Sequence, residues 1–188
     1  MNALKYYTTE EGALLLRLAG ESIRHSLDFH RPLRIELEKI PFKLQEIRAA
    51  FVTLKRDGKL RGCIGTIEAR RPLAEEVSAS ARSAAFSDPR FAPLKKEELQ
   101  NLEIKISVLT QPVPIDCKSE AELFRLLRPG QDGLLIEADQ KKATFLPEVW
   151  ETLPDPAEFL AQLKLKAGLD PARLYKNLKY FRYGTETF

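Results

Sequence analysis

The stretch from Phe51 to Ile67 constrains the fold of this chain more than any other part. It contains the dipeptide Asp57-Gly58 between two runs that are rich in apolar and β-branched residues. An Asp-Gly dipeptide in that setting is the strongest short-range signal for a β-hairpin, because a two-residue type I′ turn needs positive φ at both central positions. The sequence therefore predicts two antiparallel strands joined at this dipeptide.

The register of the hairpin follows if Arg56 and Lys59 are taken as the closing pair. Side chains alternate along a strand, so Arg61 and Cys63 are then expected to share one face, about 7 Å apart. The opposed pairs expected further from the turn are Leu54 with Arg61, Thr53 with Gly62, Val52 with Cys63 and Phe51 with Ile64.

Two glycines, Gly62 and Gly65, flank the cysteine. Glycine weakens the interior of a strand, so this pair indicates that another backbone, a helix or a ligand comes close here. A helix is expected over residues 73–86, with Pro72 suited to its first turn. Its small side chains would allow it to approach the strand at one of the two glycines.

The remaining elements alternate between helices and strands. Thr8 and Glu11 form a candidate capping box for a first helix, which has to end before Pro32. Residues 102–108 alternate between apolar and polar, which predicts a central strand. Pro112-Val113-Pro114 is expected to end that strand, and a second capping box at Ser119–Glu122 is expected to begin a helix that runs to Leu127. Residues 133–138 and 143–146 should form a hairpin across Asp139–Lys142. A helix over 157–167 between Asp155-Pro156 and Gly168, a helical turn from Asp170-Pro171 and a final strand within 178–188 should follow.

These strands are expected to pair as hairpins rather than through regular βαβ crossovers. That pattern favours an α+β fold with a mainly antiparallel sheet flanked by helices. A chain of 188 residues is long enough for one good-sized core. We therefore expect a single domain over residues 1–188, with room for a main lobe and a small subdomain.

The composition argues against two classes of partner. The 30 basic and 27 acidic residues leave a net charge of only +3, and basic residues do not cluster with aromatic ones as a nucleic-acid groove requires. The N-terminus lacks the apolar core of a signal peptide, and no apolar run approaches the roughly 20 residues that span a bilayer. We expect a cytoplasmic protein that binds neither nucleic acid nor membrane.

The run Leu60–Thr66, with the sequence LRGCIGT, is similar to the signature of the AMMECR domain family. The resemblance implies an α+β fold with one main antiparallel sheet and a smaller lobe. It also implies an association, as in the bacterial AmmeMemoRadiSam system, with Memo-type proteins and radical S-adenosylmethionine proteins. It assigns no catalytic residue. Further blocks that resemble the family, in the family's order, are Ser83–Phe91, Ile104–Thr110, Asp132–Leu135, Thr144–Trp150 and Leu163–Leu169.

Cys63 is the candidate catalytic residue. A guanidinium two residues away on the same strand face favours the thiolate, which is the reactive form of cysteine. The structural alternative is that Cys63 fills a small space in the core opposite Val52, because cysteine is among the most buried residue types. The motif leaves both roles open.

Arg61 is the first candidate ligand-binding residue. A half-buried arginine is a good bidentate anchor for a carboxylate or a phosphate. Alternatively, Arg61 extends to solvent beside Leu54 or holds an acid such as Asp88 in place. The pattern predicts a small anionic ligand only under the first interpretation.

The other candidate ligand-binding residues are Gly62, Gly65, Thr66, Asp88 and Arg90. Asp88 and Arg90 reach the same cleft if the preceding helix crosses the hairpin; the plain alternative is an Asp-Pro turn with an internal salt bridge. The glycines would offer bare backbone. Thr66 offers a hydroxyl to a ligand, or is a strand residue chosen for its β-branch.

Neither a metal site nor a cofactor site is predicted. His25 and His30 are five residues apart, which does not match the helical i, i+4 pair of a zinc site, and Cys63 and Cys117 have no zinc-type spacing. Either histidine could still meet Cys63 in space as a general base. A nucleophile elbow, a phosphate-binding P-loop and a dinucleotide glycine fingerprint are all lacking from the sequence.

Two classes of function remain. The favoured one is a component or adaptor that acts with Memo-type and radical S-adenosylmethionine proteins and has a small-anion site at the LRGCIGT hairpin. The alternative is a cysteine-dependent enzyme that binds a small anionic metabolite through Arg61 and uses Cys63 in catalysis.

Overall fold

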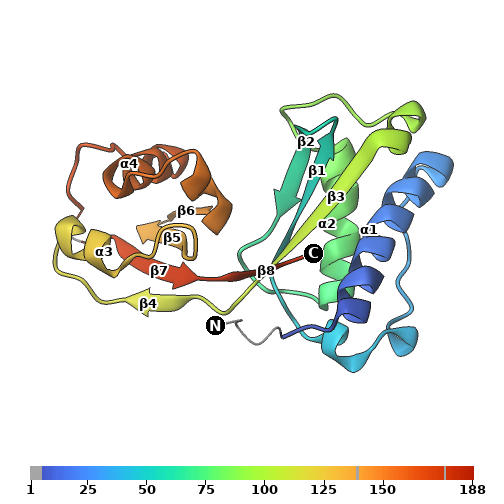
Figure 1. Cartoon of the computed structure of the whole chain (residues 1–188), viewed down its shortest axis with the longest axis horizontal. Helices are drawn as coiled ribbons and strands as arrows, with labels where there is room; N and C mark the ends of the chain where they lie inside the picture. Colours follow the sequence, from blue (N-terminus) through green and yellow to red (C-terminus); the bar gives the residue numbers. More distant parts are fainter. Residues whose placement is uncertain (1–5, 139, 176) are drawn as a thin grey trace. The chain divides into compact units, whose positions relative to one another are not determined.

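The computed structural model describes residues 6–138, 140–175 and 177–188, which form two compact units (Figure 1). The first unit contains the described residues up to Val108 together with Glu186–Phe188, and the second contains Leu109–Thr185. Each unit has its own buried apolar cluster. The α+β class and the mainly antiparallel pairing are confirmed.

The first unit is built on a four-stranded sheet in the order β2-β1-β3-β8. Strand β1 pairs antiparallel with both β2 and β3. Because β3 lies between β1 and β8, it is an interior strand, as expected. Ile106 of β3 and Phe188, just beyond β8, exchange two backbone hydrogen bonds of 3.0 Å. The strands are β1 (Ala50–Arg56), β2 (Lys59–Gly65), β3 (Leu102–Leu109) and β8 (Thr185–Thr187).

Helices α1 (Thr9–Phe29) and α2 (Leu73–Phe86) cover one face of this sheet (Figure 1). The capping box of α1 is confirmed, because the Thr8 hydroxyl accepts from Glu11 N and the Glu11 carboxylate accepts from Thr8 N. Pro72 is the N-cap of α2 rather than part of its first turn. The core between helices and sheet includes Leu15, Ile23, Val52, Leu54, Leu73, Val77 and Ile106, all fully buried.

The β1–β2 hairpin has the expected turn but not the expected register. Asp57 and Gly58 adopt φ of 51° and 73°, as a type I′ turn requires. A β-bulge then follows, because Leu60 and Arg61 together oppose Lys55. From there the pairing is shifted by one residue, and the observed pairs are Leu54 with Gly62, Thr53 with Cys63, Val52 with Ile64 and Phe51 with Gly65.

The bulge has a physical reason in the burial of β1. In the expected register Arg61 would oppose Leu54, whose side chain is fully buried beneath the helices. An arginine on that face would bury its charge against apolar groups, which is costly. The extra residue instead turns Gly62 and Ile64 toward the core and places Cys63 opposite Thr53.

Gly62 is where α2 comes closest to the sheet. A Cβ atom on Gly62 would lie 2.1 Å from the carbonyl oxygen of Ala84, so the helix backbone occupies the space of a side chain. The expected close approach is confirmed at this glycine. At Gly65 the space is taken by β1 instead, since a Cβ atom would lie 2.3 Å from Ala50 O.

The second unit contains a sheet of its own in the order β4-β7-β5-β6, with antiparallel pairs throughout. Trp150 and Phe159 stack in its core with ring centroids 3.8 Å apart. Its elements are β4 (Val113–Ile115), α3 (Glu120–Leu126), β5 (Gly133–Ala138), β6 (Lys141–Phe145), α4 (Pro156–Lys166) and β7 (Lys179–Tyr183). Short 3₁₀ helices occupy Leu37–Lys39, Phe42–Gln45 and Lys96–Asn101 in the first unit and Pro147–Glu151 in the second.

One expectation for the start of the second unit is confirmed and another is wrong. Strand β3 ends at Leu109, before Pro112-Val113-Pro114, as expected; β4 then begins at Val113 and, as an edge strand, tolerates Pro114. Ser119 caps α3, but it does not form a full capping box. The Glu122 carboxylate accepts from Lys118 N rather than from Ser119 N.

Three expectations nearer the C-terminus also need correction. Strand β6 already begins at Lys141, so the hairpin loop is shorter than the expected Asp139–Lys142; Asp139 itself lies outside the described residues. Pro171–Arg173 forms a turn, not a helix. The tail contains two strands, β7 and β8, which belong to different sheets.

None of the helices in the described part of the chain is both long and apolar enough to cross a bilayer.

The Gly62 contact leads to a stability prediction. Gly62→Ala should lower the free energy of unfolding by about 2 kcal/mol or more, because the new methyl group meets backbone atoms that have to move. Gly20→Ala in α1 is the matched control. There the new methyl group meets the flexible end of Arg24 at 3.2 Å, and the helix gains up to about 1 kcal/mol from the loss of a glycine.

Urea titration followed by far-UV circular dichroism measures both variants. Equal stability of the Gly62→Ala variant and the wild type would contradict the proposed backbone contact.

Candidate functional site

Strand β2 lies at the edge of the first sheet, and its polar backbone groups are covered by the segment that follows α2. Cys63 N donates to Asp88 Oδ2 at 2.9 Å, and Arg90 Nη2 donates to Cys63 O at 3.4 Å. Both backbone groups of Cys63 therefore point away from β1. An edge strand that is paired in this way is protected from pairing with another chain.

Asp88 is the centre of this arrangement. Its side chain is 1% exposed, and besides the Cys63 bond it accepts from Arg90 N at 3.1 Å, Nε at 2.9 Å and Nη2 at 2.7 Å. The hydrogen bonds from the Arg90 side chain hold the pKa of the Asp88 carboxyl well below its usual range, assisted by the two backbone donors and opposed by burial. The structure contains an internal salt bridge between Asp88 and Arg90 after α2. This is the arrangement that the sequence offered as the alternative to a ligand-binding role for these two residues.

Arg61 pairs with a second carboxylate, Glu98. Its Nε donates to Glu98 Oε1 at 2.8 Å and its Nη2 to Glu98 Oε2 at 3.0 Å, in a two-pronged pair whose side chains are 14% and 13% exposed. The same Nη2 donates to Ala92 O at 2.9 Å. The remaining nitrogen, Nη1, is buried and has no hydrogen-bond partner among the described residues.

Glu98 is held by more than this one arginine. It also accepts from Lys95 N at 2.9 Å and from Arg56 Nη1 at 3.2 Å. The hydrogen bonds from Arg61 lower the pKa of Glu98 to about 2, against the opposing effect of burial. Asp88 and Glu98 thus anchor the two ends of residues 88–98 to the edge of β2.

The thiol of Cys63 faces a hydroxyl rather than a core. Its sulfur lies 3.2 Å from Thr53 Oγ1, and the residue is half-buried. Val52, the expected neighbour, points into the core on the other face of β1. The interpretation of Cys63 as an apolar filler opposite Val52 is therefore wrong.

The other candidate residues lie in different places. Gly62 faces α2, whereas Gly65 and Thr66 line a small hollow of about 240 Å³. The Thr66 hydroxyl is engaged locally, accepting from Glu68 N at 3.0 Å and donating to Glu68 O at 3.1 Å. The structure therefore brings together Arg61, the Cys63 backbone, Asp88 and Arg90, but not Thr66.

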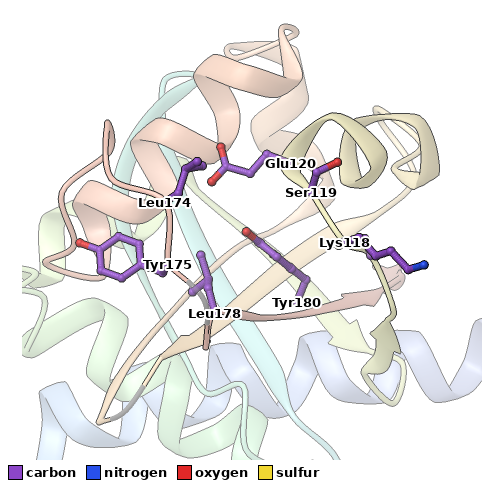
Figure 2. Close-up of a pocket in the computed structure, with 8 residues that line it drawn as sticks. Lys118, Ser119, Glu120, Leu174, Tyr175, Leu178 and Tyr180 are labelled. Carbon is purple, nitrogen blue, oxygen red and sulfur yellow. The ribbon is translucent and has the colours of Figure 1, made fainter.

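A pocket of about 390 Å³ in the second unit was missed from the sequence (Figure 2). Figure 2 shows the Tyr180 ring lying across it, with Glu120 and Leu174 beyond its hydroxyl, while Lys118 extends away. Burial raises the pKa of the Tyr180 hydroxyl, and the nearby Glu120 adds to this effect. The lining is completed by Cys117, Ser119, Tyr175 and Leu178.

Buried Lys164 of α4 holds two walls of this pocket together. Its side chain is 1% exposed, and its Nζ donates to Glu120 Oε1 at 2.6 Å and to the carbonyls of Pro171 and Arg173 at 3.2 Å each. All three ammonium hydrogens therefore have acceptors. A sequence signal existed, since Lys164 lies four residues after buried Leu160 and next to Leu163, on the apolar stripe of the helix.

No group of three or more histidine, cysteine, aspartate or glutamate side chains in the described ranges could hold a metal ion. His25 packs its ring on Phe29, with centroids 4.8 Å apart, and His30 ends α1 with a left-handed backbone. Burial raises the pKa of the Cys117 thiol, assisted by Glu122 and Asp116, which disfavours its reactive form.

The Glu98 pKa predicts a pH dependence of stability. The folded-state pKa of about 2 lies below the ordinary value of 4.5, so the contribution is fully present above pH 4.5 and is lost as the pH falls toward 2. Glu98→Gln should therefore lower the free energy of unfolding by about 3 kcal/mol at pH 7, and the difference from the wild type should shrink on acidification. Urea titrations between pH 7 and pH 2.5 measure this, and a difference independent of pH would contradict it.

The Lys164 contacts predict the stability of the second unit. Lys164→Met should lower its free energy of unfolding by about 3 kcal/mol, because a carboxylate and two carbonyls lose their donor. Trp150, the only tryptophan, lies in this unit and reports its unfolding by fluorescence. Lys118→Met, at an exposed side chain, should change the value by less than about 0.5 kcal/mol. Equal effects of the two substitutions would disagree with the role of Lys164.

Comparison with known proteins identifies the family. The family model described as AMMECR1 matches residues 16–188. A protein of Methanothermobacter thermautotrophicus is 38% identical over 181 residues, which cover 95% of this chain and 94% of the relative. Protein MJ0810 of Methanocaldococcus jannaschii is 36% identical over 193 residues, with 98% and 92% covered.

A solved structure agrees with this result. The crystal structure of the uncharacterized protein PH0010 from Pyrococcus horikoshii matches with a TM-score of 0.89 at 35% identity, over 96% of this chain and 91% of that chain. The sequence match and the structural match both extend across the two compact units. The chain therefore belongs to the AMMECR1 family.

Proposed function

We propose that this AMMECR1-family protein is a non-catalytic component that binds partner proteins, of the Memo type and the radical S-adenosylmethionine type, in the cytoplasm. The proposed contact surface is the edge of β2 together with residues 87–93. The similarity of the LRGCIGT run to the family signature supports the choice of partners.

One observation carries the proposal, namely that the charged groups around the motif are used to hold backbone in place. Asp88 is occupied by Arg90 and by the Cys63 amide, and Glu98 by Arg61, Arg56 and the Lys95 amide. Such a network fixes the shape of a surface. It does not provide the base that takes a proton from a nucleophile in covalent catalysis.

The outer side of this network has the composition of a protein interface. The Arg90 side chain is 53% exposed, and its guanidinium carbon lies 5.5 Å from the centre of the Phe91 ring. Leu60, at the bulge, is 42% exposed. Arginine and aromatic residues are enriched at protein interfaces, so a partner with an acidic patch would fit this surface.

The small-anion site at the hairpin is retained within the proposal in a narrower form. Both nitrogens of Arg61 that face Glu98 are occupied by it, which leaves the buried Nη1 as the donor for an anion. The Arg61 and Arg90 guanidinium carbons lie 5.9 Å and 5.5 Å from the centre of the same Phe91 ring. The cysteine-dependent enzyme has less support, because the hydroxyl of Thr53 beside the sulfur is not a base at neutral pH.

Co-purification with tagged partners tests the proposal. A Memo-type protein and a radical S-adenosylmethionine protein from the same genome should be retained by the wild type and by Cys63→Ser. Charge reversal in Arg90→Glu should weaken binding at least tenfold, since it places a negative charge at the centre of the surface. Arg17→Glu, at an exposed position on α1, is the matched control and should bind normally.

Far-UV circular dichroism confirms that each variant is folded before binding is compared. Failure of both partners to co-purify would overturn the proposal. So would loss of the complex in Cys63→Ser with full binding by a folded Arg90→Glu variant.

A further inference from the structure

A second hollow of the first unit lies on the side of α2 opposite to β2, the strand that carries most of the LRGCIGT run. It has a volume of about 430 Å³ and is bordered by α1, by residues 32–35 after α1, and by α2. Its lining consists of Ser22, Pro32, Leu33, Arg34, Ile35, Arg71, Glu75, Ser78, Ala79 and Arg82.

Helical spacing explains which part of α2 borders this hollow. Glu75, Ser78 and Arg82 are three and four residues apart, so they form one stripe of the helix. Ala81 and Ala84, which belong to the core, form another. The Ser22 hydroxyl donates to Ser78 O at 2.8 Å and ties the floor of the hollow to α1.

Three arginines and a single glutamate give the lining a net positive charge. Arg71 pairs with Glu76 at 3.1 Å, whereas Arg34 has only a longer-range attraction to Glu36, and neither Arg34 nor Arg82 forms a close ion pair within the described ranges. Glu75 forms no ion pair with any of them there either. Cations gathered around a hollow repel one another unless an anion is present, so the lining favours a negatively charged occupant.

Arg82 provides a second and more specific observation. Its Nε is buried and has no hydrogen-bond partner among the described residues. A buried N–H group without an acceptor is costly, and native proteins satisfy nearly all of them with protein, water or ligand. An anion in the hollow would supply the acceptor that this group lacks.

We propose that this hollow binds the phosphate group of a small phosphorylated metabolite. Because Arg71 is already paired with Glu76, Arg34 and Arg82 are the cations left for an anion, and a phosphate monoester, which carries about −1.5 to −2 charges at pH 7, can pair with both. Guanidinium groups match phosphate oxygens in geometry as well as in charge. The volume exceeds that of phosphate alone, and Leu33, Ile35 and Ala79 provide an apolar wall for the rest of the molecule.

The proposal is independent of the partner surface at the edge of β2. The hollow shares no lining residue with that surface. A failure of co-purification would therefore leave the phosphate site standing, and a failure of phosphate binding would leave the partner surface standing.

Isothermal titration calorimetry with inorganic phosphate and with phenyl phosphate tests the site. Ionic strength is held constant with chloride, so that only specific binding is measured. We expect both probes to bind the wild type, with phenyl phosphate the tighter of the two. The double variant Arg34→Met/Arg82→Met should bind at least tenfold more weakly, whereas Arg17→Met, an exposed arginine on α1 outside the hollow, should bind as the wild type does.

Arg34→Met alone guards against a folding defect, because Arg34 is exposed and lies outside the helices. It should also weaken binding measurably while leaving the circular dichroism spectrum unchanged. No binding by the wild type at constant ionic strength, or equal binding by the folded double variant, would overturn the site. Tighter binding of inorganic phosphate than of phenyl phosphate would overturn the assignment to a metabolite.

Discussion

The backbone contact between α2 and β2 at Gly62 determines the arrangement of the first unit. The Ala84 carbonyl occupies the place of a side chain on Gly62, so any residue with a Cβ atom would push the helix away from the sheet. The β-bulge at Leu60 and Arg61 makes this contact possible, because it turns the glycine toward the helix and the arginine away from it. The directions of the side chains in the motif follow from these two features together.

The segment after α2 completes this arrangement from the outside. It carries one buried carboxylate, Asp88, and one half-buried carboxylate, Glu98, and each accepts from an arginine and from at least one backbone amide. Ionised acceptors form shorter and stronger hydrogen bonds than neutral ones. Two such residues can therefore hold residues 88–95, which form neither helix nor strand, against β2. In the sequence, Arg61 and Asp88 are candidate ligand-binding residues. In the fold, Arg61 pairs with Glu98 and Asp88 with Arg90, and both ion pairs mainly support the edge of the sheet.

Local signals predicted the parts of this fold that depend on local energetics. The Asp57-Gly58 turn, the Thr8 capping box and the left-handed Gly168 after α4 each follow from a few neighbouring residues. The bulge could not be predicted in this way, because it depends on how deeply Leu54 is buried by helices remote in sequence. The tail was equally ambiguous, since alternation predicts a strand at 178–188 but not that β7 and β8 pair in different sheets.

The cost of burying charged groups distinguishes the motif edge of β2 from the hollow beside α2. Burying charged groups is costly, so a protein either pairs them internally or leaves them for a ligand to pair. Around the motif the pairing is internal and nearly complete, which a supporting role explains. In the hollow beside α2, Arg34 and Arg82 form no close ion pair among the described residues, and a buried N–H group of Arg82 has no acceptor. Residues 34, 71 and 82 meet only in the folded chain, so no sequence motif marks them. The recognisable signature therefore stabilises a surface, whereas the unpaired charge that favours a small ligand lies where the sequence gives no signal.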